Sequence, residues 1–381
     1  MRPASLQSCF VIGAEPGSLT NFRGDLIRAL VREGVAVTAL SAPQSPEQQD
    51  AIAALGATPM SYPVARTGLN PKGDLKTFRN LRALMRHKRP DAVLAYTIKP
   101  VIWGGLAARA LPKCRFYALI TGLGFAFQGQ GAVRRGLTHL VSGLYRSALT
   151  RADKVIFQNA DNRDEFIARG IVRADKCAVV SGSGVDTAKF AVAAMPAGAP
   201  VFLVIARLLG EKGLREYAAA AAMVRRRFSD AQFHLVGPPD PSPDGITLGE
   251  VEGWQASGAI VYHGATKDVR PYISNCHIYV LPSYHEGMPR TVLEALAMGR
   301  PVLTTDVPGC RETVRNGVNG HLVPKENAEA LAERMIWFLE HRDQWAAMAA
   351  ASRELATQVF DVHKINDDLL RIMGVTQAHA S

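Results

Sequence analysis

Hydrophobic positions along the first half of the chain predict strands that alternate with helices. Short apolar runs that fit buried core strands occur at 9–13, 35–40, 92–96, 115–120 and 154–158. Between the first two runs, apolar residues recur at helical spacing from Phe22 to Val31, and Gly34 ends the pattern. This alternation is typical of a parallel β-sheet covered by α-helices.

A second series of the same kind follows residues 191–200 (AVAAMPAGAP), which are small, include two prolines and read as an interdomain linker. Apolar runs predict its strands at 201–205, 232–236, 260–263, 278–281, 301–305 and 321–323. Helical patterns occur at 213–228, 269–275, 328–341, 344–360 and 361–373. We therefore predict three parts: a first domain over 1–192, a second over 198–352, and a C-terminal helix over 353–375 that crosses back to the first domain. Two doubly wound sheets imply a cleft with ligands at the carboxyl ends of the strands.

Length and composition narrow the class of protein. A chain of 381 residues with 48% hydrophobic residues suits two ordinary folded domains. No run approaches the roughly 18–20 apolar residues of a spanning helix, and no signal-peptide pattern stands at the start. The five cysteines are scattered without a C-x-x-C spacing, which favours reduced thiols over disulfides or a zinc site. These features predict a cytoplasmic protein.

Net charge differs between the two halves of the chain. Residues 1–195 hold 26 Lys and Arg against 13 Asp and Glu, a net +13, whereas residues 196–381 hold 18 against 21, a net −3; together they give the +10 of the whole chain. The basic excess suggests that the first half faces an anionic partner: a lipid surface, a diphosphate or a nucleic acid.

The most informative motif spans residues 283–314 and places Glu286 and Glu294 eight positions apart. Pro289 fits the start of a helix, because its fixed φ and missing N–H suit a first turn. The N–H groups of the next three residues then become candidates to hold a phosphate: Arg290, Thr291 and Val292. Gly287 and Met288 stand between the first glutamate and Pro289 and are assigned to the same ligand site.

A pair of cations follows the first strand of the second half. Arg207 and Lys212 stand on either side of a short loop, so their side chains could converge on one anion. Fixed cations stabilise the charge that grows on a departing diphosphate without the help of a metal. Two glycines that end later strands, Gly237 and Gly264, should border the same ligand.

The chain contains no D-x-D sequence, the acidic pair that usually holds a divalent ion on a nucleotide diphosphate. Together with the two cations, this absence predicts an enzyme that needs no metal and no resident cofactor. The expected ligand is a substrate that carries the diphosphate.

Three loops of the first half are candidates for a second binding region. Residues 13–28 contain Gly17, which could bring the backbone close to a phosphate, and Arg23. Lys99 lies in a loop after the strand at 92–96. Residues 120–127 (ITGLGFAF) form a further glycine loop, in which we single out Thr121 and Gly122.

These motifs resemble those of the retaining GT-B glycosyltransferases of family 4, which carry an E-x7-E pair and an R-x4-K pair. The resemblance implies two doubly wound Rossmann-like α/β domains facing a central cleft. It also implies that Glu286 meets the donor sugar and that Glu294 meets the nucleotide ribose. Arg207 and Lys212 would bind the donor diphosphate, and the leaving phosphate would take the acceptor proton during same-face attack.

The TIKP and TGLGF sequences in the first half are similar to those of enzymes that extend undecaprenyl-diphosphate-linked sugars in O-antigen, capsule or glycoprotein glycan assembly. Among these, N-acetylgalactosaminyltransferases are the most similar. The resemblance implies a polyprenyl-diphosphate-linked acceptor near Lys99 and Thr121. One departure concerns a histidine that many family members place in the loop at 121–124, where this chain has Thr-Gly-Leu-Gly, so no role for that histidine carries over.

Two basic segments predict contact with an anionic membrane. Residues 75–89 and 132–154 combine apolar residues at helical spacing with many cations, although a core-facing helix with a solvated basic side gives the same pattern. The basic excess of the first half favours peripheral association with the cytoplasmic face of the inner membrane.

Other functions remain open on the sequence alone. A UDP-sugar epimerase or hydrolase on the same fold would release product without an acceptor, and a basic nucleic-acid adaptor would bind any polyanion in a salt-sensitive way. Nothing in the chain resembles a nucleic-acid module. The preferred donor is UDP-GalNAc, followed by other UDP-hexoses; a GDP-mannose-dependent mannosyltransferase is a further alternative.

Overall fold

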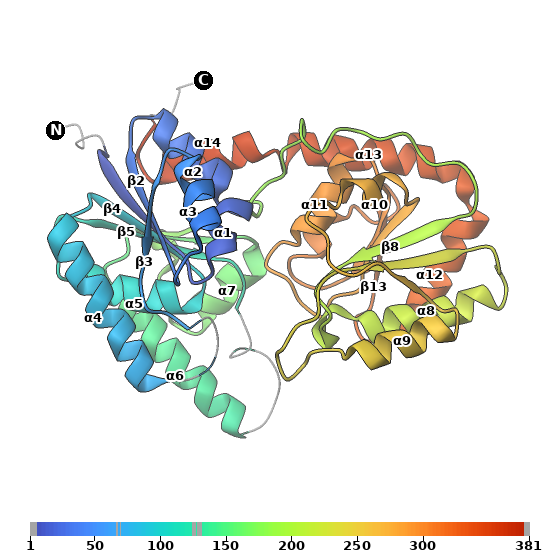
Figure 1. Cartoon of the computed structure of the whole chain (residues 1–381), viewed down its shortest axis with the longest axis horizontal. Helices are drawn as coiled ribbons and strands as arrows, with labels where there is room; N and C mark the ends of the chain where they lie inside the picture. Colours follow the sequence, from blue (N-terminus) through green and yellow to red (C-terminus); the bar gives the residue numbers. More distant parts are fainter. Residues whose placement is uncertain (1–5, 66–67, 69, 124–126, 128–131, 377–381) are drawn as a thin grey trace. The chain divides into compact units, whose positions relative to one another are not determined.

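The computed structural model describes residues 6–65, 68, 70–123, 127 and 132–376, which fall into two compact units (Figure 1). The first unit comprises Met1–Ser183 together with His363–Ser381, and the second comprises Gly184–Val362. The chain therefore passes from one unit to the other at two places, Ser183–Gly184 and Val362–His363.

The sheet of the first unit has seven strands, and every neighbouring pair is parallel. The strands, in chain order, are β1 (Ser8–Ile12), β2 (Ala36–Ser41), β3 (Thr58–Ser61), β4 (Ala92–Tyr96), β5 (Arg115–Ile120), β6 (Lys154–Phe157) and β7 (Cys177–Val179). In space they run β3-β2-β1-β4-β5-β6-β7. The five predicted strands occupy the centre, whereas β3 and β7 lie at the edges, are less buried and carry no long apolar run that would reveal them.

Helices cover both faces of this sheet, as expected for parallel strands joined by crossovers. They are α1 (Pro16–Asn21), α2 (Gly24–Arg32), α3 (Pro46–Ala53), α4 (Pro71–Lys88), α5 (Ile98–Ala108), α6 (Ala132–Leu149), α7 (Ala160–Ala168) and α14 (Val362–Ile372). The helix predicted from Phe22 is α2, which starts two residues later than expected. The short helix α1 precedes it in the glycine-bearing stretch that the sequence predicted as a loop, and the chain breaks between the two helices at Phe22 and Arg23.

The C-terminal helix α14 belongs to the core of the first unit although it follows the second unit in sequence. Ile365, Leu369 and Leu370 are buried in the same hydrophobic cluster as β1 and β4. Just beyond the helix, the Tyr117 hydroxyl donates to the Met373 carbonyl at 2.9 Å. The amphipathic pattern of this last segment thus reflects packing against β-strands.

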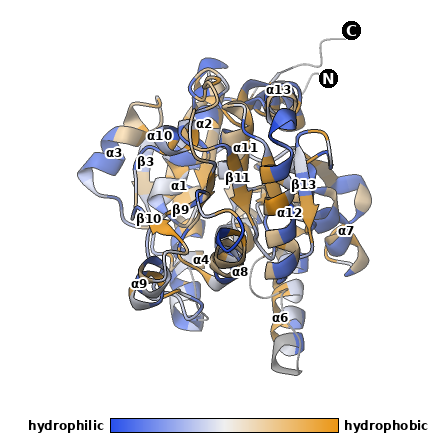
Figure 2. Ribbon diagram, turned by 90° about the vertical axis from the view of Figure 1, so that its right-hand side faces the viewer, coloured by the Kyte–Doolittle hydropathy of each residue, from blue (hydrophilic) through white to orange (hydrophobic). Residues whose placement is uncertain are grey.

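The second unit repeats the architecture with a six-stranded parallel sheet in the order β10-β9-β8-β11-β12-β13. Its strands are β8 (Val201–Ile205), β9 (Gln232–Val236), β10 (Val261–Tyr262), β11 (Ile278–Leu281), β12 (Val302–Thr305) and β13 (Gly320–Val323). Its helices are α8 (Leu214–Arg225), α9 (Leu248–Ala256), α10 (Arg270–Ser274), α11 (Arg290–Ala297), α12 (Ala328–Glu340) and α13 (Trp345–Gln358). In Figure 2 the hydrophobic colour marks strands such as β11, while helices such as α3 and α7 show both hydrophobic and hydrophilic residues.

A buried arginine fixes the segment that the sequence analysis read as the linker. The guanidinium of Arg300 is fully buried and donates to the carbonyls of Ala193 and Ala194 at 2.9 and 3.0 Å. It also donates to four carbonyls of neighbouring turns: Ile273, Ser274, Met298 and Gly299. Because these bonds hold residues 193–194 against α10 and α11, the second unit begins at Gly184, before the predicted boundary at 192.

Strand order reverses once in each sheet, between β1 and β4 in the first unit and between β8 and β11 in the second. Ligands of doubly wound folds bind beyond the carboxyl ends of the strands at such switch points. The loops that leave these strands carry most of the candidate residues named above. In the described part of the chain, no helix has both the length and the apolar character needed to cross a bilayer.

Candidate functional site

The centre of the candidate site in the second unit is an ion pair between Lys212 and Glu286. Lys212 ends a short 3₁₀ turn (Gly210–Lys212) after β8, and Glu286 lies in the loop after β11. The Lys212 Nζ donates to the Glu286 Oε1 at 2.6 Å, and the Ser283 hydroxyl donates to the same oxygen at 2.8 Å. The switch point of the sheet thus brings together two residues that are 74 positions apart in sequence.

Both charged side chains of this pair are largely buried, with 15% and 16% of their surfaces exposed. Burial by itself would raise the pKa of the Glu286 carboxyl, but the Lys212 ammonium and the Ser283 hydroxyl outweigh it and lower that pKa. Burial would likewise lower the pKa of Lys212, but the Glu286 charge raises it. Both groups are therefore charged at neutral pH, and the cation stays available to an anionic ligand.

A glycine in a neighbouring loop fixes the backbone of Glu286. The Glu286 N–H donates to the Pro308 carbonyl at 3.2 Å. Gly309 has φ +85°, and a Cβ there would stand 2.5 Å from the Glu286 carbonyl oxygen. Only glycine allows this approach, so the loop after β12 supports the loop that carries the carboxylate.

Arg207 contacts a different carboxylate from the one that Lys212 contacts. Its guanidinium pairs with Asp240, whose other oxygen accepts from the Ser242 N–H at 3.0 Å. Gly237 makes this possible, because a Cβ there would lie 1.8 Å from the Ala206 carbonyl oxygen. The expected convergence of Arg207 and Lys212 on one anion is thus not present in this structure, where each cation holds its own acid.

The second glutamate of the motif stands inside α11. Glu294 is 7% exposed and accepts from the Arg290 Nε at 3.0 Å. Burial raises the pKa of its carboxyl, although the Arg290 charge offsets part of that effect. A ligand hydroxyl that donates to this carboxylate would find a nearly dry environment, in which a hydrogen bond to a charged group is strong.

The first turn of α11 differs in detail from the sequence prediction. Pro289 is the N-cap residue, so the helix starts one position later than expected. The Val292 N–H already donates to the Pro289 carbonyl at 3.1 Å and therefore does not face a ligand. The Thr291 hydroxyl donates to the Ile205 carbonyl at 3.4 Å, which ties this turn to the end of β8. Gly287 is buried and Met288 half-buried beside it.

The other predicted glycine, Gly264, follows β10 and supports the loop of Gly237. Its carbonyl accepts from the Gly237 N–H at 2.8 Å, and the Tyr262 hydroxyl donates to the Gly237 carbonyl at 2.8 Å. Both glycines thus lie at the carboxyl edge of the second sheet, as the sequence predicted.

In the first unit, the candidate residues gather around Tyr96 at the end of β4. Arg23, only 3% exposed, lies with its guanidinium 5.1 Å from the centre of the Tyr96 ring. The Tyr96 hydroxyl shares a hydrogen bond of 2.8 Å with Ser18, one residue after Gly17 in α1. Burial raises the pKa of Tyr96 to about 12, so the hydroxyl keeps its proton at neutral pH.

The remaining candidates of the first unit follow β4 and β5. Lys99 lies in the first turn of α5 and not in the predicted loop, because the helix begins at Ile98, two residues after β4 ends. The Lys99 Nζ stands 3.0 Å from Oδ1 of Asp74, which belongs to α4. Thr121 and Gly122 follow β5 and are half-buried. Residues 124–126, which the sequence analysis included in the same glycine loop, lie outside the described residues.

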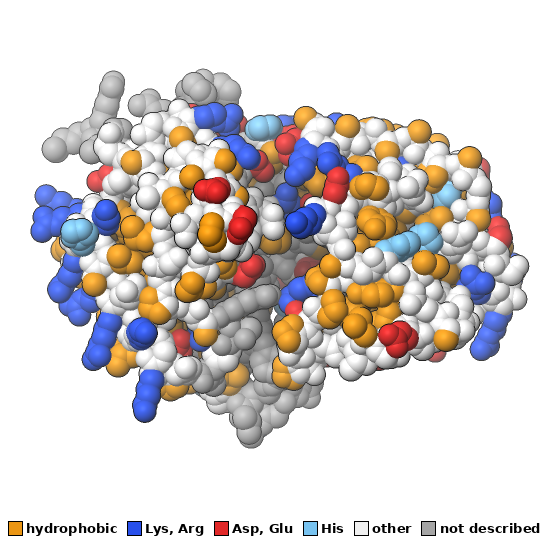
Figure 3. All heavy atoms as spheres, in the orientation of Figure 1, with side chains coloured by type: hydrophobic (Ala, Val, Ile, Leu, Met, Phe, Trp, Pro, Cys, Tyr) orange, Lys and Arg blue, Asp and Glu red, His pale blue; other side chains and the backbone are white. Residues whose placement is uncertain are grey.

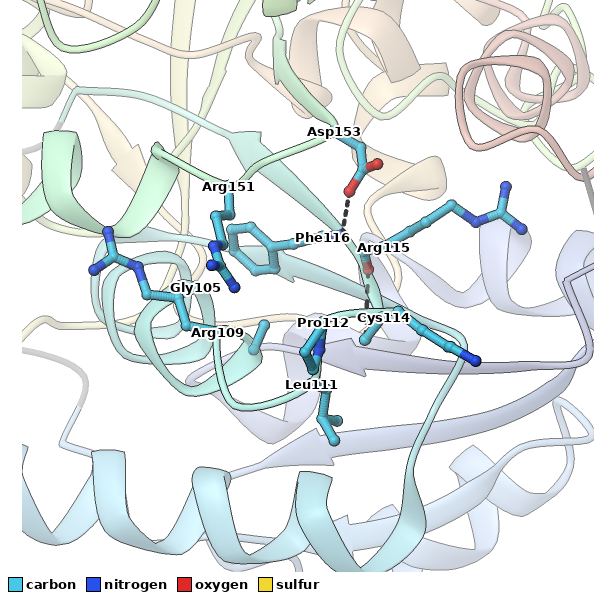
Figure 4. A pocket seen from close by; sticks show the side chains of 11 residues that line it. Gly105, Arg109, Leu111, Pro112, Cys114, Arg115, Phe116, Arg151 and Asp153 are labelled. Atoms are coloured by element: carbon cyan, nitrogen blue, oxygen red, sulfur yellow. Dashed lines mark hydrogen bonds between the residues drawn. The ribbon is translucent and has the colours of Figure 1, made fainter.

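A cavity of about 440 Å³ lies away from all of these residues (Figure 4). Its wall is formed by the end of α5, the start of β5 and the loop before β6, so it lies at the amino edge of the first sheet. Arg109 and Arg151 line it, and Arg109 donates to the Ser147 carbonyl near the end of α6. Arg109 and Arg151 stand at the C-terminal ends of α5 and α6, where a cation offsets the negative end of the helix dipole. This effect explains the two arginines without a ligand.

Sequence reasoning missed four residues that complete the two sites: Asp74, Tyr96, Asp240 and Ser283. Ser283 was within reach, because it stands three positions before Glu286 and two residues after the end of β11. Asp240 follows β9 in a proline-rich loop, and only the tertiary fold brings it to Arg207. Among the described residues no group of three or more His, Cys, Asp or Glu side chains is arranged to hold a metal ion.

Comparison with known proteins identifies both units. Residues 199–341 match the family model described as glycosyl transferases group 1, and residues 19–182 match the glycosyl transferase 4-like domain. The chain is 31% identical over 336 residues to the N,N'-diacetylbacillosaminyl-diphospho-undecaprenol alpha-1,3-N-acetylgalactosaminyltransferase of Campylobacter jejuni, covering 85% of this chain and 87% of that protein.

A second relative and a solved structure agree with this assignment. The UDP-Gal:alpha-D-GlcNAc-diphosphoundecaprenol alpha-1,3-galactosyltransferase of Escherichia coli is 24% identical over 282 residues, 69% of this chain and 70% of that protein. The fold resembles that of Anabaena HepE in complex with UDP and glucose, with a TM-score of 0.77 and 18% identity over 97% of this chain and 100% of that one. With its two Rossmann-like α/β units, the chain belongs to the group 1 glycosyltransferases of GT-B fold.

Proposed function

We propose that this enzyme transfers GalNAc, or another hexose or N-acetylhexosamine, from a UDP-sugar to an undecaprenyl-diphosphate-linked saccharide in surface glycan synthesis. The observation that carries the proposal is the 31% identity to the Campylobacter enzyme over 87% of its length. That enzyme is named for a diphospho-undecaprenol acceptor and for GalNAc transfer. The name of the Escherichia coli relative supplies UDP as the donor nucleotide and again a lipid diphosphate acceptor.

The second unit supplies the donor site of this proposal. Lys212 and Arg207 neutralise the nucleotide diphosphate as the glycosidic bond breaks, which requires Arg207 to exchange Asp240 for phosphate oxygens. Glu286, oriented by Ser283 and Lys212, binds hydroxyls of the donor sugar. Glu294 accepts hydrogen bonds from the ribose. Because these cations can carry the charge of the leaving group, the reaction needs no metal ion.

The first unit supplies the acceptor site. Arg23, Thr121 and Gly122 lie on loops at the carboxyl edge of its sheet, Lys99 lies there in the first turn of α5, and Gly17 lies beside them in α1. Both relatives named above form an alpha linkage, and nucleotide sugars of this class are themselves α-linked. Transfer with retention follows: the acceptor hydroxyl attacks from the face that the leaving diphosphate occupies, and a phosphate oxygen takes its proton.

Nucleotide release with and without an acceptor tests this proposal. The purified protein is incubated with a panel of UDP- and GDP-sugars in EDTA, with or without a short-chain polyprenyl-diphosphate sugar. We expect UDP release that depends on the acceptor and persists in EDTA. Release without acceptor supports an epimerase or hydrolase, and release from GDP-mannose alone supports a mannosyltransferase.

Substitutions of Arg207 and Glu294 separate turnover from binding in the donor site. Arg207→Ala should lower kcat by about 100-fold and change the nucleotide Kd little, because the arginine interacts most strongly with the negative charge that develops on the departing diphosphate.

Glu294→Ala should weaken the Kd for UDP about tenfold, since one charge-assisted hydrogen bond is lost. Calorimetric titration with UDP and steady-state kinetics check both, and unchanged values in both variants refute the donor site.

A basic face of α4 supports peripheral contact with an anionic membrane. Five cations at helical spacing are exposed along this face: Lys72, Lys76, Arg79, Arg82 and Arg86. Leu75 lies among them and is 45% exposed. Lys and Arg side chains accordingly line the left edge of the molecule in Figure 3, where Figure 1 places α4.

Helix α6 fits this role less well than α4 does. Both helices pack apolar residues into the core of the first unit, α4 through Leu81 and Met85 and α6 through Val141, Tyr145 and Leu149. The two helices differ in their cations, because those of α4 are exposed along one face. Arg146 donates to the carbonyls of Arg169 and Gly170. The side chain of Arg134, a predicted membrane contact, lies outside the described residues. We therefore assign the membrane surface to α4.

Vesicle binding tests the role of α4. A variant with Lys72, Lys76 and Arg79 replaced by Gln should bind vesicles that contain anionic phospholipid about 100-fold more weakly, at about 1 kcal/mol for each cation. A matched variant replaces three exposed cations of the second unit, Arg226, Lys267 and Lys325, and should bind like the wild type. Equal losses in the two variants would indicate attraction by net charge and remove α4 from the proposal.

A further inference from the structure

Thr97 has a backbone conformation that side chains rarely adopt. It follows β4 directly, with φ 66° and ψ 164°. This region of φ and ψ is populated almost only by glycine, because a Cβ clashes with the adjacent peptide groups. Arg89 and Glu326 also have positive φ among the described non-glycine residues, but Arg89 lies in the ordinary left-handed helical region with ψ 57°.

The hydroxyl of Thr97 does not compensate for this strain within the described chain. Thr97 is the N-cap residue of α5, where a threonine hydroxyl ordinarily accepts from the first turn, yet it makes no such bond. Its Oγ1 is buried and has no hydrogen-bond partner among the described residues. If the backbone conformation were all that mattered, glycine would provide it without strain and without a buried unsatisfied oxygen.

Lys99, two residues further on, has unused hydrogen-bonding capacity in the same turn. Its side chain is 12% exposed and its ammonium lies 3.0 Å from Asp74, itself 13% exposed. The geometry of this ion pair makes no hydrogen bond, and the Nζ has no other partner in the described part of the chain. An ammonium and a hydroxyl with donors to spare thus belong to the same short turn.

The neighbouring structure holds this turn in place. The preceding residue, Tyr96, packs so closely on the loop after β1 that a Cβ on Gly13 would stand 2.2 Å from its hydroxyl. The Tyr62 hydroxyl donates to the Gly13 carbonyl at 2.8 Å. The turn therefore lies on a rigid rim at the point where the strand order of the first sheet reverses, which is where a doubly wound sheet binds its ligand.

We propose that Thr97 is a specificity residue for the acceptor: its hydroxyl donates to a phosphate oxygen of the acceptor diphosphate, and Lys99 neutralises the same group. This inference rests on the proposed function. The ligand satisfies two buried polar groups that the chain leaves unsatisfied, and it reaches them as Lys99 exchanges Asp74 for phosphate. The strained backbone is retained because glycine could supply the turn but not the hydroxyl.

Three substitutions of Thr97 separate the hydroxyl from the backbone and from methyl packing. Thr97→Val keeps the shape and the strain but removes the hydroxyl. Thr97→Ser keeps the hydroxyl, and Thr97→Gly removes both the side chain and the strain. Each variant is assayed with a short-chain polyprenyl-diphosphate sugar and with the same sugar as a neutral alkyl glycoside, and its Tm is measured.

For Thr97→Val we expect the KM for the diphosphate acceptor to rise at least about tenfold, as for the loss of a hydrogen bond to a charged group, with the donor KM unchanged. Rates with the alkyl glycoside should equal those of the wild type. Thr97→Ser should retain the wild-type KM within about twofold. Thr97→Gly should raise the Tm yet show the same KM defect as the valine variant.

The outcomes keep this inference distinct from the function on which it rests. If the wild type is active and Thr97→Val has an unchanged acceptor KM, the role of the hydroxyl is refuted and the proposed function stands. An equal loss on the alkyl glycoside would show a general effect on the fold and also refute it. If the wild type does not use the diphosphate acceptor at all, both proposals fail.

Discussion

Replacing Lys212 by Met is expected to lower kcat for sugar transfer by about 100- to 1,000-fold. The ammonium is a buried cation of the proposed donor site, and fixed charges of this kind stabilise the developing negative charge of a leaving group most strongly in a dry environment. Steady-state nucleotide release at saturating donor and acceptor measures the effect. Lys212→Arg keeps the charge and should recover part of the activity, while Lys325→Met, on an exposed lysine of the same unit, should match the wild type.

The same substitution leaves Glu286 buried without its cation, which gives a second readout. In the native pair the pKa of Glu286 is lowered, so its stabilising contribution is present above the ordinary pKa of a glutamate and is lost as the pH falls through the lowered value. Lys212→Met should therefore weaken this acid-sensitive part of the stability.

The kinetic result decides the role of the lysine. If kcat of Lys212→Met were within about threefold of the wild-type kcat, Lys212 would not act on the leaving diphosphate.

Replacing Arg300 by Met is expected to reduce the free energy of unfolding by about 3–5 kcal/mol. The buried guanidinium donates to six carbonyls, and without it several of them would remain unsatisfied in the interior. Urea unfolding of the two proteins measures the difference. Arg226→Met, on an exposed arginine after α8, is the matched control and should change stability by less than about 0.5 kcal/mol.

Arg300→Lys refines the interpretation, because lysine keeps a charge but cannot reach six acceptors with one ammonium. We expect it to be nearly as destabilising as methionine. A loss below about 1 kcal/mol for Arg300→Met would contradict the view that this residue holds residues 193–194 to the second unit.

The strand pattern and the donor motif could be predicted because their signals are local. Buried parallel strands are short apolar runs, so the central strands of both sheets were found to within a residue or two. The positions of Glu286 and Glu294 around one helix start follow from their spacing in the sequence, whereas the roles proposed for them come from the family resemblance. Edge strands such as β3 carry no such signal, since half of their surface is exposed.

Pairings between distant loops could not be read in this way. Lys212 meets Glu286 and Arg207 meets Asp240 only because the strand order brings their loops to the same edge. The strain at Thr97 leaves no trace in the sequence, since threonine is ordinary after a strand. The basic segments at 75–89 and 132–154 have the same pattern in the sequence. Only the structure shows that cations of α4 are exposed along one face while Arg146 of α6 donates to backbone carbonyls.

The most direct test of the proposed reaction is mass spectrometry of the lipid-linked product. The enzyme is incubated with UDP-GalNAc and a short-chain polyprenyl-diphosphate-linked sugar in EDTA, and the acceptor is extracted. We predict that its mass increases by one N-acetylhexosamine residue, with the diphosphate intact. An unmodified acceptor in the presence of released UDP, or no reaction with any UDP-sugar, would contradict transfer to a lipid-linked saccharide.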